Sequence, residues 1–367
     1  MTLAMSPQTH FHRPPGSDAF EPPEAHGVAR DAVKLLVARP GGVTHTRFAD
    51  LGAQLRPGDV LVVNNSATLP AAVDGRRAGR LIAVHFSMAR AEKLWVVEPR
   101  LADTAEHLTD IQPGERIDLP GGAALVIGSS YPEPGLGGAR LWTARVILEG
   151  PAGAVTSYLG RYGRPIRYSY VPRAWPLRYY QTVFARSAGS AEMPSAARPF
   201  TTQLVTALVA AGIAIAPITL HAGVSSAEAG EPPTPEPFAV PAATARMVNS
   251  AHAAGSRVIA VGTTATRALE SAANADGVVR PAAGWTDLVL GPGRPCRVVD
   301  GLITGWHDAG ASHLLLLEAA AGPELVAMAY REAVEHGYLW HEFGDSALLL
   351  PGRGYRPPST TGRQAPA

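Results

Sequence analysis

Several short apolar runs of this chain are followed by side chains that can move protons or hold charged groups. The runs cover residues 60–63, 213–219, 258–261 and 297–303. The side chains that follow them are those of Asn64, Asn65, His221, Thr263, Thr264, Thr304 and His307. A neutral histidine can accept a proton near pH 7, while hydroxyl and amide groups can hydrogen-bond a bound molecule. Asp345, just before an apolar run at 347–350, can orient a histidine or face a positive charge.

The run at residues 258–261 leads through a glycine turn into a helical pattern. Its β-branched side chains are typical of a buried strand. Gly262, Thr263 and Thr264 then present free backbone N–H groups and two hydroxyls at one point, which suits a carboxylate or a phosphate. The alternative is an ordinary strand-to-helix turn whose threonines only cap the helix.

The elements expected to position these side chains alternate between helices and apolar strands from residue 195 onward. Helices are expected at residues 201–211, 243–254 and 323–336, and strands at the runs given above. This alternation predicts an α/β domain with a parallel or mixed sheet. In such sheets reactive groups collect just past the carboxyl ends of the strands, so we expect the polar residues to share one rim. Taken singly, each of them can instead be an ordinary loop or turn residue.

Between roughly residues 76 and 149 the pattern changes to short alternating segments separated by glycine-rich turns. Strands are expected at residues 80–86, 94–97, 116–119, 124–127 and 141–148. Short strands at this spacing predict a small antiparallel barrel.

The expected organisation is a large α/β domain over residues 26–75 and 150–351, with the barrel inserted over residues 76–149. Residues 1–25 and 352–367 are rich in Pro, Ser, Thr and Gly, so mobile tails are expected there.

The composition excludes several classes of protein. The chain has 367 residues and a formal net charge of +1, so no overall field draws it to nucleic acid or membrane, and any basic site must be local. Cys296 is its only cysteine, which excludes an internal disulfide and a cysteine-rich metal site. Without a close His-x-x-x-His spacing, no metal is expected.

Residues 1–30 lack the apolar core of a signal peptide. The longest apolar stretch, 204–220, is too short and interrupted to span a membrane, so the expected compartment is the cytoplasm.

Residues 150–191 contain no Asp or Glu but are rich in arginine and aromatic side chains. These are Arg161, Arg164, Arg167, Arg173, Arg178 and Arg186, interleaved with Tyr158, Tyr162, Tyr168, Tyr170, Trp175, Tyr179 and Tyr180. Arginines contact phosphates and aromatic rings stack on exposed bases, so the stretch 158–186 is a candidate RNA-binding segment. The alternative is a connector that wraps the large domain with aromatic anchors.

Several segments, taken in order, carry a family resemblance. They include LRPGDVLVVNN (55–65), YQTVFA (180–185), TLHAG (219–223), RVIAVGTTATRALESA (257–272) and VVDGLIT (298–304), and Gly344-Asp345 closes the series. With these segments over roughly residues 30–350, the chain resembles the S-adenosylmethionine:tRNA ribosyltransferase-isomerase family of queuosine biosynthesis. The order and spacing of so many segments make a chance match unlikely.

The resemblance implies a large α/β, barrel-like domain carrying a small β-barrel insertion. It also implies that S-adenosylmethionine is a co-substrate. The family transfers the ribosyl part of that molecule onto 7-aminomethyl-7-deazaguanine in a tRNA anticodon and isomerises it, giving epoxyqueuosine with release of adenine and methionine. No metal is required.

The resemblance also suggests roles for particular residues. The sulfonium makes the neighbouring C5′ hydrogens acidic, so His221 and His307 are candidate bases, with Asp345 orienting a histidine or facing the sulfur. Arg267 and the Gly262-Thr263-Thr264 turn are candidates for holding the methionine carboxylate. The remaining candidate binding residues are Asn64, Asn65, Tyr180, Gln181, Asp300 and Thr304.

The chain departs from the family pattern at several motif centres. A histidine expected in the segment 194–200 is absent, Ser225 stands where a glycine is usual, only Glu236 remains of a His-x-x-His-x-Glu pattern, and Ala67 and Ala72 stand where arginines are usual. These departures leave two alternatives open. One is a diverged paralogue that uses S-adenosylmethionine on another, small-molecule acceptor, and the other is a non-catalytic module that binds RNA or a nucleotide.

Overall fold

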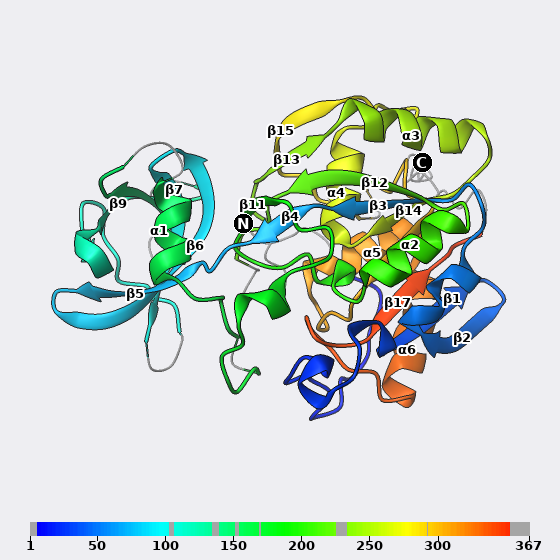
Figure 1. Cartoon of the computed structure of the whole chain (residues 1–367), viewed down its shortest axis with the longest axis horizontal. Coiled ribbons are helices and arrows are strands. Elements are labelled where there is room, and N and C mark those ends of the chain that lie inside the picture. The colour runs from blue at the N-terminus through cyan, green and yellow to red at the C-terminus, as the bar shows by residue number, and fades with distance from the viewer. Residues whose placement is uncertain are drawn as a thin grey trace, which may run out of the picture.

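The computed structural model describes residues 6–102, 106–133, 139–150, 154–168, 170–224, 233–291 and 293–352. It contains a large α/β part and a smaller β-barrel, which lie side by side (Figure 1). The expected fold class, a large α/β domain with an inserted antiparallel barrel, is confirmed. The departure at Ser225 and the predicted tail beyond residue 352 lie outside the described residues.

A nine-stranded mixed sheet forms the centre of the large part. Its order is β15 (Ala282–Thr286), β13 (Glu236–Val240), β12 (Ala214–Leu220), β3 (Val60–Asn64), β14 (Val258–Val261), β16 (Gly301–Thr304), β17 (Ser346–Leu349), β1 (Lys34–Arg39) and β2 (Gly42–Arg47). β15 and β2 are its end strands, so the sheet is open and does not close into a barrel-like ring.

The central strands of this sheet bring the predicted polar residues to one edge. β12, β3, β14 and β16 are adjacent and parallel, whereas β17 runs antiparallel to β16. The carboxyl ends of the parallel strands therefore meet at the same edge, together with the amino end of β17.

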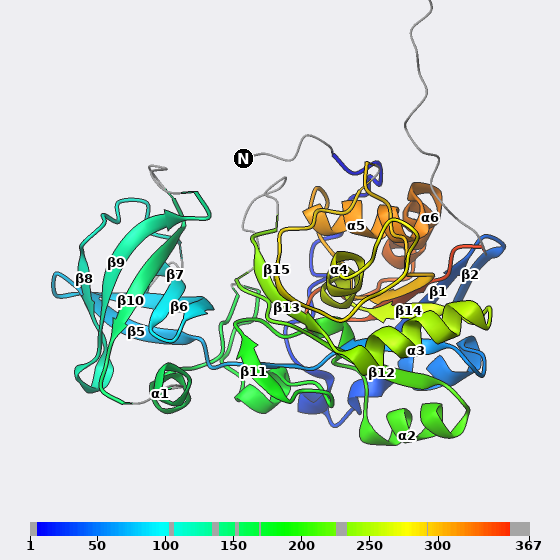
Figure 2. The ribbon, with the colours of Figure 1, turned by 90° about the horizontal axis from the view of Figure 1, so that it is seen from above.

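Helices cover both faces of the sheet. They are α2 (Thr202–Ala210), α3 (Ala242–Ala253), α4 (Thr263–Ser271), α5 (Ser312–Ala321) and α6 (Pro323–Glu335). Because side chains alternate along a strand, Val60 and Val62 of β3 pack into the core with α3 to α6, while Leu61 and Val63 pack into the core with α2. Figure 2 shows α2 on the opposite side of the sheet from α4, α5 and α6. None of the described helices combines the length and the apolar character needed to cross a bilayer.

Shorter elements complete the large part. β4 (Ser66–Thr68) and β11 (Ser187–Ser190) pair in parallel as a separate two-stranded sheet. The 3-10 helices are η1 (Pro23–His26), η2 (Arg30–Ala32), η3 (Phe48–Gln54), η4 (Pro120–Gly122), η5 (Leu177–Tyr180) and η6 (Ser195–Ala197), of which η4 lies in the barrel.

The barrel is a closed ring of six antiparallel strands. In chain order they are β5 (Ala72–Arg77), β6 (Arg80–Ala91), β7 (Leu94–Leu101), β8 (Arg116–Asp118), β9 (Ala124–Tyr131) and β10 (Leu141–Ile147). All five expected strands are present, and β5 closes the ring by pairing with both β6 and β8. α1 (Ala154–Tyr162) follows the barrel and packs on it through Val155 and Leu159, and Tyr158 donates to the Pro120 carbonyl at 2.9 Å.

One predicted strand is shorter than expected. The apolar run at 297–303 predicted a strand along its length, but only Gly301–Thr304 forms one. The backbone N–H groups of Arg297, Val298 and Val299 instead donate to the buried carboxylate of Glu270, at 2.8 to 3.2 Å. A side-chain acceptor on α4 thus replaces the neighbouring strand as hydrogen-bond partner.

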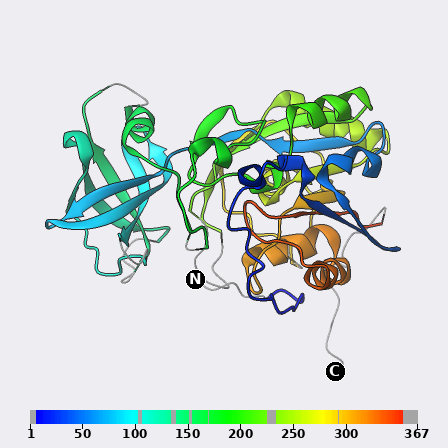
Figure 3. The same cartoon turned by 60° about the horizontal axis from the view of Figure 1, so that its bottom comes forward.

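The N-terminal segment packs on the large part from Ser6 onward, although its composition predicted a mobile tail over residues 1–25. The Thr9 amide donates to the Glu318 carboxylate at 2.7 Å, and the Ala19 amide donates to the Trp340 carbonyl at 3.1 Å. Phe11 packs against Tyr330, with ring centroids 4.7 Å apart. These contacts hold the segment against the C-terminal elements, and Figure 3 shows the ribbon of the segment beside them.

Candidate functional site

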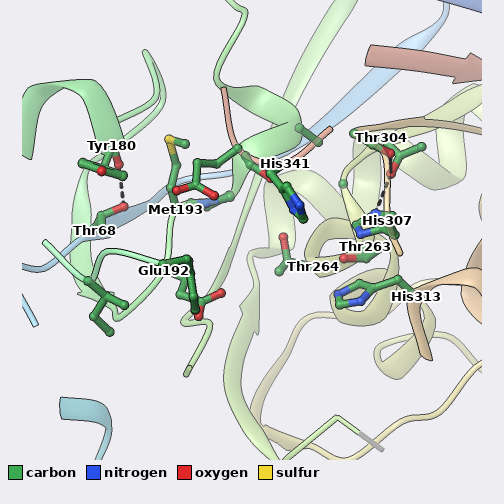
Figure 4. Close-up of a pocket in the computed structure, with 18 of the residues that line it drawn as sticks. Thr68, Tyr180, Glu192, Met193, Thr263, Thr264, Thr304, His307, His313 and His341 are labelled. Carbon is green, nitrogen blue, oxygen red and sulfur yellow. Dashed lines mark hydrogen bonds between the residues drawn. The ribbon is translucent and has the colours of Figure 1, made fainter. Parts of the chain in front are cut away.

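A cavity of about 200 Å³ opens at the edge of the sheet where β14 and β16 end. Segments that are far apart in the sequence line it, and the close-up in Figure 4 shows their side chains converging. The lining residues with polar side chains include Thr68, Tyr168, Tyr170, Tyr180, Glu192, Thr263, Thr264, Thr304, His307, His313, His341 and Glu342. The cavity is therefore rich in groups that can hydrogen-bond or exchange protons.

The amino end of α4 forms one wall of the cavity. Gly262, with φ of 92°, turns the chain from β14 into the helix, and its amide donates to the Ile303 carbonyl at 2.8 Å. Thr263 and Thr264 occupy the first turn of α4, where backbone N–H groups have no acceptor within the helix. The positive end of the helix and two hydroxyls thus point to a place where an anion can be held.

Two stacked histidines form a second wall. The rings of His307 and His313 are 4.4 Å apart and nearly parallel, at 1°. His307 Nε2 lies 3.2 Å from Thr304 Oγ1, and the His307 amide donates to the Tyr330 hydroxyl at 3.2 Å. Burial, together with neighbouring His313 and His341, holds the pKa of His307 well below its ordinary value. Burial lowers the pKa of His313 to about 4. Both imidazoles are therefore neutral near pH 7, and a neutral imidazole can accept a proton.

His341 completes this group from the segment before β17. Its backbone has a positive φ of 70°, which is a strained conformation for a histidine. Its ring stacks on Tyr170 with centroids 4.0 Å apart, and its Nε2 lies 2.8 Å from both Arg13 Nη1 and Asp18 Oδ1. The N-terminal segment therefore fixes the orientation of a cavity residue.

A carboxylate and a phenol are paired at the same wall. The Tyr170 hydroxyl donates a short hydrogen bond to Glu342. Burial raises the pKa of Glu342, and burial with the adjacent Glu342 raises that of Tyr170. The phenol consequently keeps its proton, and burial also favours the protonated form of Glu342.

The structure brings several predicted site residues into this cavity and leaves others beside it. Tyr180, Gly262, Thr263, Thr264, Thr304 and His307 line it. Asn64, Asn65, Gln181 and His221 lie next to the lining but serve the framework. Asn64 Nδ2 donates to the Leu220 carbonyl at 2.8 Å and to Thr264 Oγ1 at 3.2 Å, so it ties β12 to α4.

The other three neighbours are engaged in a similar way. Thr219 Oγ1 donates to Asn65 Oδ1 at 2.7 Å, and the Thr68 amide donates to Gln181 Oε1 at 3.0 Å. His221 Nδ1 lies 2.7 Å from Ser66 Oγ, and burial lowers the pKa of its imidazole. His221 is thus neutral and near the edge, but it is not among the residues that line the cavity.

Arg267 does not reach the cavity. Its guanidinium pairs with Glu236 on β13 and donates to the backbone carbonyls of Thr286 and Leu288, each at 3.1 Å. Only 6% of the residue is exposed. Arg267 lies about one turn from the amino end of α4 and its side chain contacts β13 and β15, so the helix end, and not this side chain, faces the cavity.

Two predicted carboxylates also lie elsewhere. Asp300 precedes β16 and is therefore at the opposite edge of the sheet, where it accepts from the Val258 amide at 2.8 Å and lies 3.1 Å from His252 Nε2. Asp345 is at the cavity edge of the sheet, but its carboxylate accepts from the backbone amides of Lys34 and Leu339, at 2.7 and 2.9 Å. Burial raises its pKa. Its observed contacts are structural.

The sequence did not single out His313, His341 or Glu342. His313 stands at the start of the apolar helix α5, and His341 and Glu342 stand just before the Gly344-Asp345 motif. His341 and Glu342 reach the cavity because β17 runs antiparallel to β16, which places the residues before β17 at the same edge as the ends of β14 and β16. That direction is not visible in the sequence.

These observations define a class of protein: an open α/β sheet with an inserted antiparallel barrel, and a cavity at the strand ends equipped to hold an anion and move a proton. The model of the family described as queuosine biosynthesis protein matches residues 7–349, and the chain belongs to this family.

Known relatives cover nearly the whole chain. The S-adenosylmethionine:tRNA ribosyltransferase-isomerase of Moorella thermoacetica is 39% identical over 93% of this chain and 98% of its own length. The protein of the same name from Symbiobacterium thermophilum is 36% identical over 88% and 94%. A solved structure of S-adenosylmethionine tRNA ribosyltransferase from Thermotoga maritima covers 93% of this chain and 99% of that chain, with a TM-score of 0.51 and 25% identity.

Proposed function

We propose that this chain is an S-adenosylmethionine:tRNA ribosyltransferase-isomerase. It moves the ribosyl part of S-adenosylmethionine onto 7-aminomethyl-7-deazaguanine in tRNA and isomerises it, giving epoxyqueuosine, adenine and methionine. The observation that carries this proposal is similarity at 39% identity to a relative of that name over 98% of the relative's length. The two alternatives, another acceptor or a non-catalytic module, are not favoured by these comparisons.

The cavity supports binding of the donor at the amino end of α4. A carboxylate placed there accepts hydrogen bonds from the first-turn amides and from the hydroxyls of Thr263 and Thr264. Such charge-assisted hydrogen bonds are about twice as strong as neutral ones. In this proposal the helix end takes the part that the sequence suggested for Arg267.

His307 is the base that the geometry favours for removing a C5′ proton. The atom that accepts the proton must be neutral beforehand, and burial keeps both His307 and His313 neutral. Thr304 and Tyr330 hold the His307 ring and backbone in place. Glu342 lines the same cavity, so its carboxyl oxygens are placed where they can face the positive sulfonium of the donor. We expect no metal to be needed for this reaction.

The segment 158–186 supports binding of the tRNA. All six of its arginines are exposed, and three of its tyrosines, Tyr168, Tyr170 and Tyr180, line the cavity. Cationic side chains at the surface and aromatic rings at the cavity wall belong to one connector between the barrel and the large part. This is the arrangement expected for an RNA loop that is held by its phosphates while one base enters the cavity. Because the acceptor is a tRNA, we expect the reaction to take place in the cytoplasm.

Release of adenine tests this function directly. The purified chain is incubated with S-adenosylmethionine and tRNA carrying 7-aminomethyl-7-deazaguanine, and adenine is quantified by chromatography. The proposal expects one adenine for each modified base. The matched control is the same tRNA with guanine in place of the precursor base, which should release none. Release with both tRNAs, or with neither, would contradict the proposed acceptor.

A further inference from the structure

A group of metal-binding side chains lies at the far end of α6, outside the cavity. It consists of His45 on β2 with Glu332 and His336, which are four residues apart at the end of α6. One ligand atom from each of the three lies within 4.8 Å of the other two. His45 is separated from the other two by most of the chain, so the fold and not the local sequence brings them together.

We propose that His45, Glu332 and His336 form a binding site for Zn²⁺. The observed geometry is close to what this ion needs, because Glu332 Oε2 lies 3.5 Å from His45 Nε2 and 3.5 Å from His336 Nδ1. Ligand atoms about 2.0–2.1 Å from a tetrahedral zinc are about 3.4 Å apart. Two imidazoles and one carboxylate leave a fourth position for water.

The surroundings of His45 prepare it for this role. Its Nδ1 lies 2.9 Å from the Tyr338 hydroxyl, which leaves Nε2 directed toward Glu332. Zinc-binding histidines almost always hydrogen-bond through the nitrogen that does not touch the metal, because this contact fixes the tautomer and the ring orientation. Tyr338 is buried, at 1% exposure, so it holds the ring from a rigid position.

His336 has to change two contacts to bind the ion. Its ring now lies against that of His45, with centroids 4.1 Å apart. Its Nδ1 now lies 2.9 Å from the Glu332 carbonyl at the end of α6. Its side chain is 51% exposed, so the ring can rotate toward the ion without disturbing the core. Lys34 Nζ donates to the carbonyls of His336 and Gly337, and this nearby positive charge weakens attraction for a cation. We therefore expect micromolar affinity.

The chemistry of the ligands selects the kind of ion. Imidazole nitrogens suit zinc and its transition-metal neighbours, whereas Mg²⁺ and Ca²⁺ prefer oxygen ligands. A bound ion would join β2, an end strand of the sheet, to α6 and to the segment that leads through Tyr338 to His341. A bound ion would thus cross-link these elements and stabilise this side of the molecule. The site does not depend on the proposed reaction.

Calorimetric titration of the chelator-treated protein with Zn²⁺ tests the site. One ion per chain is expected to bind with micromolar affinity and to raise the melting temperature, while Mg²⁺ gives no heat and no shift. His45→Ala and His336→Ala should each weaken binding at least tenfold, and Tyr338→Phe should weaken it roughly 10- to 100-fold.

His252→Ala is the matched control, because His252 also pairs with a carboxylate, Asp300 at 3.1 Å, but belongs to no such group of three among the described residues. It should bind zinc as the unaltered chain does. The site residues His45 and His336 are exposed, so their variants are expected to melt within a few degrees of the unaltered chain without metal. Saturable binding that survives both histidine substitutions, or an absence of binding to the unaltered chain, would overturn the proposal.

Discussion

His307 is surrounded by groups that keep its imidazole uncharged. Removal from water disfavours the protonated form, and the stacked ring of His313 adds a second group that would repel a positive charge. At the same time Thr304 Oγ1 lies at 3.2 Å and limits ring rotation. A single side chain thus combines the right protonation state with a fixed position, which is what proton abstraction requires.

Replacing His307 by glutamine should remove the base but keep a neutral polar side chain. We expect the rate of adenine release to fall roughly 10²- to 10⁴-fold, with affinity for S-adenosylmethionine changed only a few-fold. Single-turnover kinetics and equilibrium binding measure the two quantities separately. His252→Gln, at the opposite edge of the sheet, should leave both unchanged. An unimpaired rate in His307→Gln would assign the base elsewhere, with His221 the next candidate.

The pH dependence of the rate follows from the lowered pKa of His307. A base works when it is deprotonated, so activity is lost as the pH falls through the pKa of that group. Because this pKa lies well below 6.5, the rate should stay level across pH 6.5 and decline only in more acidic solution. His313→Gln removes one cause of the lowered pKa of His307. The pH at which this variant loses activity should therefore move toward 6.5. If the rate of the unaltered chain already falls around pH 6.5, the assignment of His307 as the base is contradicted.

The helix α4 serves two different purposes at its two ends. Its amino end faces the cavity, and its interior carries Arg267, which is bound to Glu236 and to carbonyls near β15. Arg267 therefore connects α4 to β13 and β15, the antiparallel strands at one side of the sheet. Burial raises the pKa of Glu236, and the charge of Arg267 opposes that change.

Arg267→Met should affect stability and not donor binding. Breaking a buried ion pair leaves an unpaired charge and typically costs about 3–5 kcal/mol, so we expect a loss of that order in the free energy of unfolding. The KM for S-adenosylmethionine should change less than about twofold, because the guanidinium does not line the cavity. Adding Glu236→Gln to Arg267→Met should recover much of the stability. A large rise in KM with normal stability would return Arg267 to the donor site.

Elements were predictable from the sequence where one signal was strong. The period of the apolar residues located the helices and the strands that lead to Asn64, Thr264 and His307, and these positions do meet at one edge. Asp300 lies at the opposite edge because the strand predicted over 297–303 begins only at Gly301. The antiparallel direction of β17 was not predictable, which is why His341 was missed. Nor was the carboxylate of Glu270, which takes the hydrogen bonds of residues 297–299 and shortens β16. Both depend on contacts between segments distant in sequence.

At the scale of the whole molecule, the barrel and the large part contact each other through side chains and are also linked by a connecting segment of the chain. Arg90 of β6 lies over the ring of Trp285 on β15 at 4.1 Å, and the Tyr131 hydroxyl donates to the Pro235 carbonyl at 3.2 Å. The connector with the exposed arginines runs between the two parts and supplies a wall of the cavity. A tRNA bound along it would therefore reach both parts at once.

Removing exposed arginines from this connector should weaken tRNA binding without altering donor binding. Arg161 and Arg178 are exposed and lie over the rings of Tyr162 and Tyr179, at 5.2 and 4.8 Å. If each contacts a phosphate, Arg161→Ala and Arg178→Ala should each reduce the slope of log affinity against log salt by about 0.7–0.9. The control is Arg246→Ala, an exposed arginine on α3 that should leave the slope unchanged. Fluorescence anisotropy at several salt concentrations measures these slopes, and equal slopes in all the variants would assign tRNA binding to another surface.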